Sequence, residues 1–340
     1  MSAFPMQWPT AHGGPFIQGV IRQQPEDFHV TEIPRYEPEG EGDFLWLKIR
    51  KRNQNTDWIA QQLIKIAGIK NNDVQYAGKK DRNAVTEQWF SIHLHGQAEP
   101  DLQALLSDDV QILESVRDRS GLRRGNLKGN DFTICVRKLE GDIPALETVL
   151  ETIQQQGIPN YFGEQRFGHD GNNLLCAQQL FTDSSFRPAK NLRGIYLSAA
   201  RSYLFNKVLS YRVYHGHWNQ AMDGEWLQSP ASKSRFIIGR MDDATRARID
   251  KMEINPTGPL WGKGQPESKR ECLQMEQRLL NSLETFRTGL EKAGLQQDRR
   301  SLRLRVENLS WDIEGDVLQM TFFLPAGCYA TSLLREIVCY

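Results

Sequence analysis

The densest group of reactive side chains lies in one short segment, from Tyr76 to Thr86. There Asp81 stands between Lys80 and Arg82, and Gly78 just before them allows the backbone to turn tightly. Cations on both sides favour the ionised form of a carboxylate. An ionised carboxylate in a turn can act as a nucleophile or stabilise developing positive charge. A solvated polar turn would have a similar sequence, so this segment taken alone leaves both interpretations open.

A second group of side chains is basic and leads into a predicted strand. Five cations lie within twelve residues: Arg117, Arg119, Arg123, Arg124 and Lys128. This density fits a loop that contacts phosphates. Just after it, Asn130 could hydrogen-bond to a base edge and Phe132 could stack on a base. The alternative is a solvated loop whose phenylalanine begins the next strand and enters the core.

Two histidine pairs and one glycine-rich segment raise the question of a metal or a cofactor. His93-x-His95 and His215-x-His217 have the spacing of ligands on one side of a strand, but no adjacent Cys or carboxylate completes either set. Residues 258–264 resemble a phosphate loop only superficially, with three residues in place of four before Gly262-Lys263. No G-x-G-x-x-G follows a predicted strand. The sequence therefore predicts neither a metal centre nor a nucleotide cofactor.

Two further polar segments are better explained by structural roles than by catalysis. The cations at 48–52 end a predicted strand and are expected to be solvated: Lys48, Arg50, Lys51 and Arg52. Residues 160–173 hold Glu164, Arg166 and His169 among glycines and could form a catalytic loop. We favour a rigid hinge built by the aromatic residues of the same segment, because it lies where we place a domain crossing.

The charges of the chain cancel overall but not locally. Its 340 residues include 42 Lys+Arg and 42 Asp+Glu, so the formal net charge is zero. Residues 156–304 carry 22 Lys+Arg against 15 Asp+Glu, a net of +7, and the remainder carries 20 against 27, a net of −7. The basic middle is therefore expected to bind the backbone of a nucleic acid.

The cysteines and the hydropathy pattern indicate the compartment. Five cysteines lie far apart, without a C-x-x-C motif, which argues against a disulfide scaffold or structural zinc. No stretch approaches the roughly 20 apolar residues that a membrane helix needs. We therefore expect a cytoplasmic protein.

The order of the predicted elements indicates an α/β (α+β) protein with an insertion. Strands are predicted at 28–33, 43–50, 89–94, 110–116, 132–139, 302–309 and 317–324. Helices are predicted between Asn55 and Gly68 and at 144–157, 192–215, 269–292 and 329–338. A strand-rich beginning and end enclose a helix-rich middle. This pattern predicts one domain formed by 1–155 and 305–340, interrupted by a second domain at 156–304.

Seven motifs in chain order resemble those of the TruD family of tRNA pseudouridine synthases. They are PEDF at 25–28 followed by Val30 and Glu32, AGKKDRNAVT at 77–86, KGNDF at 128–132, NYFGEQRFG at 160–168, ARSYLFN at 200–206, PTGPLWG at 256–262 and LPAGCYATSLLRE at 324–336. Each motif is modestly specific, but seven in order across nearly the whole chain are strongly so. One departure is Arg22, where we expect a lysine in this family.

The resemblance implies a pseudouridine synthase fold, with a mixed and largely antiparallel sheet, and an inserted α/β domain specific to TruD. It implies a monomer that converts uridine 13 of tRNA to pseudouridine without a cofactor. Asp81 would be the nucleophile. Four residues would form the uridine pocket: Phe28, Asn130, Phe132 and Tyr329. The cation that pairs with Asp81 stays open among Arg22, Lys80 and Arg335. Alternatives are a synthase for another RNA and a non-catalytic RNA-binding module.

Overall fold

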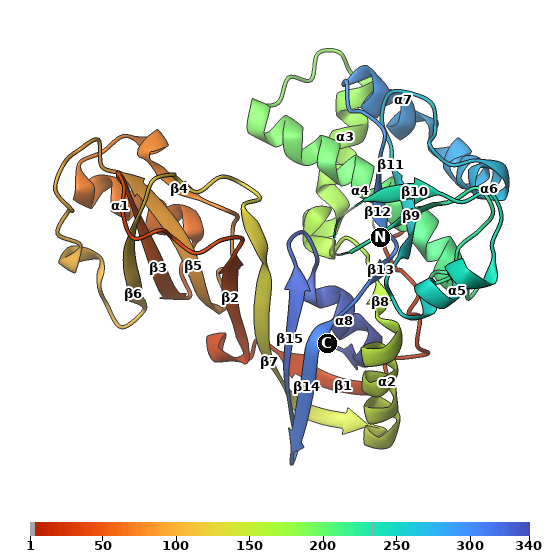
Figure 1. Cartoon of the computed structure of the whole chain (residues 1–340), viewed down its shortest axis with the longest axis horizontal. Helices are drawn as coiled ribbons and strands as arrows, with labels where there is room; N and C mark the ends of the chain where they lie inside the picture. The colour runs from red at the N-terminus through yellow and green to blue at the C-terminus, as the bar shows by residue number, and fades with distance from the viewer. Residues whose placement is uncertain (1–3, 231, 233) are drawn as a thin grey trace. The chain divides into compact units, whose positions relative to one another are not determined.

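The computed structural model describes residues 4–230, 232 and 234–340, and the chain forms two compact units (Figure 1). The sheet unit contains Ile17–Gly141, Val306–Gly327 and Cys339–Tyr340. The helical unit contains the residues before Ile17, together with Asp142–Arg305 and Cys328–Val338. Both units are thus assembled from segments that are far apart in the sequence.

The sheet unit is built on one mixed sheet. Its strands are β1 (Ile17–Ile21), β2 (Phe28–Pro34), β3 (Phe44–Arg52), β4 (Val74–Tyr76), β5 (Val85–His93), β6 (Val110–Asp118), β7 (Leu127–Gly141), β14 (Glu307–Glu314) and β15 (Val317–Pro325). The main path is β14-β15-β7-β2-β5-β3-β6, while β1 pairs with β7 and β4 with β5. Only the β2–β5 pair among these described strands is parallel. The predicted mixed, largely antiparallel sheet is confirmed.

β3 and the helix α1 (Thr56–Ala67) show how the alternating pattern forms the core. Leu45 and Leu47 of β3 pack with Leu63 of α1 in one buried cluster. On the other face of β3, Trp46 is fully buried in a cluster with Trp89. Leu122 also packs in that cluster, and the Trp46 indole donates to the Ser120 carbonyl at 2.8 Å, so this face is covered by the chain that follows β6. Gly68 ends α1 in a left-handed conformation, as predicted.

The helical unit combines seven helices of the described chain with short strands. The helices are α2 (Ile143–Gln156), α3 (Asn172–Thr182), α4 (Lys190–Tyr214), α5 (Asp243–Asp250), α6 (Arg270–Leu280), α7 (Glu284–Lys292) and α8 (Ala330–Ile337). The strands are β8 (Ile158–Pro159), β9 (Trp226–Gln228), β10 (Arg235–Ile237), β11 (Asn255–Leu260), β12 (Asp298–Ser301) and β13 (Arg303–Leu304), and β16 (Val338–Cys339) ends the chain's elements. Four of the strands form a sheet in the order β10-β9-β11-β12, and β13 pairs with β8.

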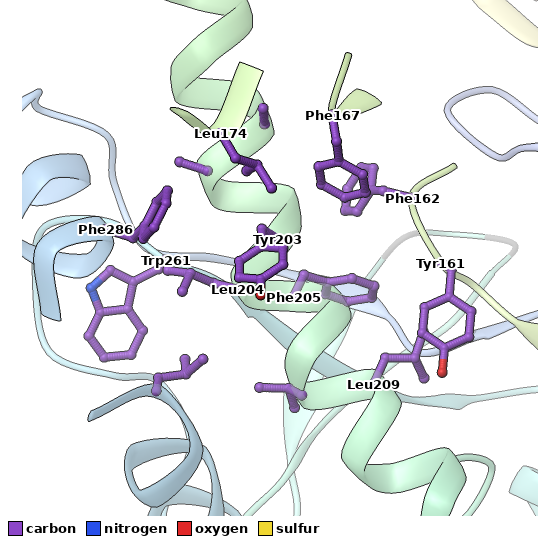
Figure 2. Close-up of a cluster of buried hydrophobic side chains, with 14 of the residues drawn as sticks. Tyr161, Phe162, Phe167, Leu174, Tyr203, Leu204, Phe205, Leu209, Trp261 and Phe286 are labelled. Atoms are coloured by element: carbon purple, nitrogen blue, oxygen red, sulfur yellow. The ribbon is translucent and has the colours of Figure 1, made fainter. Parts of the chain in front are cut away.

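The core of the helical unit forms around α4 (Figure 2). Tyr203 and Phe205 of α4 point into a cluster that also receives Tyr161, Phe162 and Phe167. The glycine-rich segment at 160–173 therefore enters a core through its aromatic residues, as expected for the rigid segment that we favoured over a catalytic loop.

Two predictions concern this part of the chain: the helical segment at 269–292 and the domain boundaries at 156 and 304. The helical segment predicted at 269–292 is confirmed, and it is divided into α6 and α7 by a 3-10 turn at Asn281–Leu283. Asn and Ser in that turn compete with helical hydrogen bonding through their side chains. The domain boundaries at 156 and 304 stay a prediction. The compact units group α2, α8 and the segment before Ile17 with the helical unit.

Candidate active site

Asp81 lies in the loop that connects β4 to β5, and its carboxylate is ion-paired with Arg22. Arg22 Nη2 is 2.7 Å from Asp81 Oδ2, and 54% of the Asp81 side chain is exposed. Arg22 directly follows β1 in a left-handed backbone conformation, with a φ of 57°. Its guanidinium also lies over the Phe28 ring, 4.1 Å from the centroid. Of the three cations left open by the sequence, Arg22 is the one that contacts this carboxylate.

Buried polar side chains hold the backbone of the same loop. Gln88 of β5 donates a hydrogen bond to the Gly78 carbonyl. The Lys80 amide donates to Thr56 Oγ1 at 3.0 Å, and that hydroxyl donates to Gln88 Oε1 at 2.9 Å. Thr56 and Gln88 are both buried. Because these bonds are shielded from water, they fix the loop more firmly than exposed contacts would.

Lys80 does not contact Asp81 through its side chain. Its ammonium forms an ion pair with Glu32 of β2, and both side chains are nearly inaccessible to solvent. Burial raises the pKa of the Glu32 carboxyl, and the charge and hydrogen bond of Lys80 oppose that rise. This buried pair ties the loop to β2.

Lys51 was expected to be solvated, and this expectation is wrong. The residue is fully buried at the end of β3, and its ammonium donates to the carbonyls of Gln54, at 2.7 Å, and Asp81, at 3.1 Å. Burial lowers the pKa of Lys51 to about 8, while the charge of Asp81 opposes the shift and that of Lys80 adds to it. The sequence places Lys51 in a cationic run, and its burial depends on strands distant in the sequence.

The aromatic residues of the site form a buried layer below the loop. The Phe132 ring stacks on Phe322 with centroids 5.2 Å apart, and Phe28 meets Phe132 edge-on at 6.2 Å. Phe28 and Phe132 are both buried, so Phe132 enters the core, but it does so from within β7, which begins at Leu127. Only 7% of Phe132 is exposed, so a base could contact only this small part while the rest of the residue packs in the core.

Asn130 carries an unsatisfied acceptor. It lies opposite Glu32 in the pairing of β2 with β7. Its Oδ1 atom is buried and accepts no hydrogen bond within the described chain. An orphaned buried acceptor costs about 1–3 kcal/mol, so such an atom is a candidate to accept a hydrogen bond from a ligand.

Tyr329 and Arg335 belong to the helical unit, where local contacts fix both side chains. The Tyr329 hydroxyl accepts hydrogen bonds from Arg166 Nε, at 3.1 Å, and Nη2, at 2.6 Å. Arg335 donates to the Trp8 carbonyl, and its guanidinium lies 5.0 Å from the Tyr161 ring centroid. The structure thus brings six predicted residues together in the sheet unit: Arg22, Phe28, Lys80, Asp81, Asn130 and Phe132.

One of the histidine pairs acquires carboxylate neighbours in the fold. Asp73, His93 and His95 offer ligand atoms that all lie within 4.8 Å of one another. Asp43 Oδ2 also lies 2.9 Å from His93 Nε2. We found no carboxylate next to this pair in the sequence, and the conclusion that none completes it is wrong, because the fold brings Asp43 and Asp73 beside the two histidines. Asp73, His93 and His95 could hold a transition metal. In the other histidine pair, burial lowers the pKa of His217 to about 4.

No helix in the described part of the chain combines the length and apolar character needed to span a membrane.

Comparisons with known proteins agree across the chain. The family model for tRNA pseudouridine synthase D (TruD) matches residues 10–187 and 177–337. A tRNA pseudouridine synthase D of Methylococcus capsulatus is 47% identical over 331 residues, which cover 97% of this chain and 94% of the relative. One of Aeromonas hydrophila is 44% identical, covering 96% and 92%. A crystal structure of a putative TruD from Methanosarcina mazei matches the fold with a TM-score of 0.74 at 21% identity, covering 96% and 95%.

Proposed function

The chain belongs to the tRNA pseudouridine synthase D (TruD) family, and on that premise we propose that it converts uridine 13 of tRNA to pseudouridine, with Asp81 as nucleophile. One observation supports this role above the others. Buried groups hold the loop backbone at Gly78, Lys80 and Asp81, while the Asp81 carboxylate itself remains exposed. A reactive group on a fixed backbone needs little reorganisation to meet its substrate.

The reaction breaks the N1–C1′ bond of the uridine, turns the uracil and forms a C5–C1′ bond. The proton lost from C5 is balanced by one gained at N1, so the conversion is redox-neutral and our proposal includes no cofactor. The carboxylate can serve three routes: attack at C1′, attack at C6, or removal of a ribose proton to give a glycal. In each route Arg22 supplies a counter-charge and holds the direction of the carboxylate.

Base recognition is assigned to the side chains around the loop. The orphaned Asn130 Oδ1 can accept a hydrogen bond from the N3–H of uracil. Phe28 and the accessible part of Phe132 would limit the pocket on the apolar side. A uridine stacked within tRNA must first be extruded, which costs a few kcal/mol. Tyr329 and Arg335 are included because of the family resemblance, and the basic segment 156–304 is proposed to bind the tRNA backbone.

The nucleophile is tested with Asp81→Asn, which keeps the size of the side chain and removes its charge. Release of tritium from C5-tritiated uridine in tRNA should fall by on the order of 10³-fold or more. Asp109→Asn is the matched control, because Asp109 is another exposed carboxylate of the sheet unit with an arginine partner, Arg52 at 3.5 Å. Tritium release by Asp81→Asn at the level of this control would overturn the assignment.

The target position is tested separately with transcripts. A tRNA in which uridine 13 is replaced by cytidine should yield no pseudouridine with the wild-type protein. Conversion at any other uridine of that transcript would show that the proposed position is wrong, while leaving the role of Asp81 intact.

A further inference from the structure

A cavity of about 690 Å³ opens in the sheet unit beside the loop that carries Asp81. Its walls come from β3, α1, β4 and the turn before β7, and include Phe44, Gln61, Gln75, Tyr76, Arg123 and Arg124. The volume lies in the range of about 300–1,000 Å³ that is typical of small-molecule sites. None of the residues assigned to the target uridine lines it.

The cations of the basic segment fall into two groups with respect to this cavity. Arg117 Nε lies 2.7 Å from Glu99, and Arg119 pairs with both Glu39 and Glu41. Within the described residues, neither Arg123 nor Arg124 has a carboxylate oxygen within 4 Å. Both are exposed. The two arginines at the cavity are therefore available to an anion.

The single carboxylate of the cavity wall is already matched by other groups. Asp57 accepts hydrogen bonds from Lys79 Nζ at 2.5 Å and from the Tyr76 hydroxyl at 2.6 Å. These bonds lower the pKa of Asp57, and the charge of Arg124 contributes further. The cavity wall therefore carries a net positive charge, because Arg123 and Arg124 outnumber Asp57.

The wall also combines aromatic rings with amides in a tightly packed arrangement. Phe44 and Tyr76 present aromatic surface, and Gln61 and Gln75 present hydrogen-bond donors and acceptors. A Cβ atom at Gly121 would lie 2.4 Å from Gln75 Oε1 and 2.8 Å from the Phe44 ring. Any larger residue at this position would push into the wall, so glycine sets its shape.

The cavity is joined to the candidate active site through the backbone. Tyr76 directly precedes the Asp81 loop, and the Gly125 amide, just after the two arginines, donates to the Ala77 carbonyl at 3.0 Å. A ligand of the cavity would lie against the same short segment of chain that carries the nucleophile.

We propose that this cavity binds one unpaired nucleotide of the substrate RNA, distinct from the target uridine. Its base would lie against Tyr76 and Phe44, and its phosphate would contact Arg123 and Arg124. This inference rests on the proposed function for the identity of the RNA. Aromatic surface, amides and free arginines are the groups with which proteins recognise single-stranded nucleotides.

The charge part of the proposal is tested by binding of fluorescent tRNA transcript over a series of NaCl concentrations. Arg123→Gln/Arg124→Gln should lower affinity about tenfold and reduce the salt slope by about 1 to 2. Arg117→Gln/Arg119→Gln removes the same charge from cations that already have partners, and should change affinity less than twofold. Equal losses in the two double variants, or no loss in either, would overturn the proposal.

The base part is tested with Gln61→Trp, which fills the cavity from the exposed face of α1 without changing charge. Its affinity should fall several-fold while the salt slope stays that of the wild type. Binding as tight as the wild type would contradict insertion of a base. Circular dichroism and thermal unfolding check that each variant is folded. Absence of tritium release by the wild-type protein would refute the proposed function, whereas these binding results decide the cavity independently.

Discussion

Buried cations of the two units are stabilised in different ways, although the sheet unit also contains the buried Lys80–Glu32 pair. In the helical unit, Arg212 and Glu225 are fully buried as a pair with 3.0 Å between their atoms, and Arg299 pairs with Glu276 at 2.6 Å. In the sheet unit, the fully buried Lys51 donates instead to two backbone carbonyls, one of them that of Asp81. The first arrangement satisfies each charge with an opposite charge. The second uses a charge to hold a loop whose reactive group stays outside.

The comparison predicts that the helical unit depends most on its pairs for stability. Arg212→Met leaves Glu225 charged, buried and without its cation, and should lower the free energy of unfolding by about 3–5 kcal/mol. Urea unfolding followed by circular dichroism measures this loss. The control is Arg235→Met, since Arg235 forms an exposed pair with Asp298 at 2.6 Å. That control should lose no more than about 1 kcal/mol, and a similar loss in both variants would remove the distinction.

Replacement of Lys51 should affect catalysis more than stability. Lys51→Met removes the hydrogen bonds to Gln54 and Asp81 but also removes a costly buried charge, so the two effects on stability oppose each other. A loop displaced by about 1 Å can cost on the order of 10²-fold in rate. We expect kcat for tritium release to fall by about that factor with little change in KM. Lys48→Met is the control, because Lys48 is paired with Glu114. Unchanged kcat in Lys51→Met would show that the loop does not need this contact.

A smaller effect should appear in the pH dependence of stability. Because burial lowers the pKa of Lys51 to about 8 from 10.5, the folded protein binds fewer protons than the unfolded chain between these values. The stability of the wild type, measured relative to Lys51→Met, should therefore rise as pH increases from 8 to 10.5. A flat or falling difference in urea unfolding would contradict the burial of a charged amine.

The helical unit should show the opposite sign through Glu336. Burial raises the pKa of Glu336 to about 7, while the amides of Ala11 and His12 donate to it and oppose the shift. The folded state then binds more protons between pH 4.5 and 7, so this group's contribution to stability falls as pH rises through that range. Glu336→Gln should remove this slope. A slope that persists in the variant would mean that another group causes it.

The sequence predicted well what depends on local pattern. The helix predicted between Asn55 and Gly68 corresponds to α1, and the strand predicted at 43–50 corresponds to β3. The motif at 77–86 located the Asp81 loop. These features are set by neighbouring residues, or by motifs that the family shares.

The sequence failed where long-range packing decides the environment. Lys51 lies in a run of cations, and only the neighbouring strands and the Asp81 loop make it buried. The carboxylates near His93 come from Asp43 and Asp73, which are 50 and 20 residues away in the chain. The choice of Arg22 as the partner of Asp81 likewise required a contact across 59 residues.

The pairing of β15 with β7 has a consequence for synthesis of the protein. β15 pairs with β7 from Val317 to Pro325, and Phe322 stacks on Phe132. A ribosome makes the whole of 142–305 between these two strands. Until β15 emerges, the nascent sheet exposes one edge of β7, and the aromatic layer lacks one of its rings. The site in the sheet unit is thus completed only after β15 has been synthesised and has paired with β7.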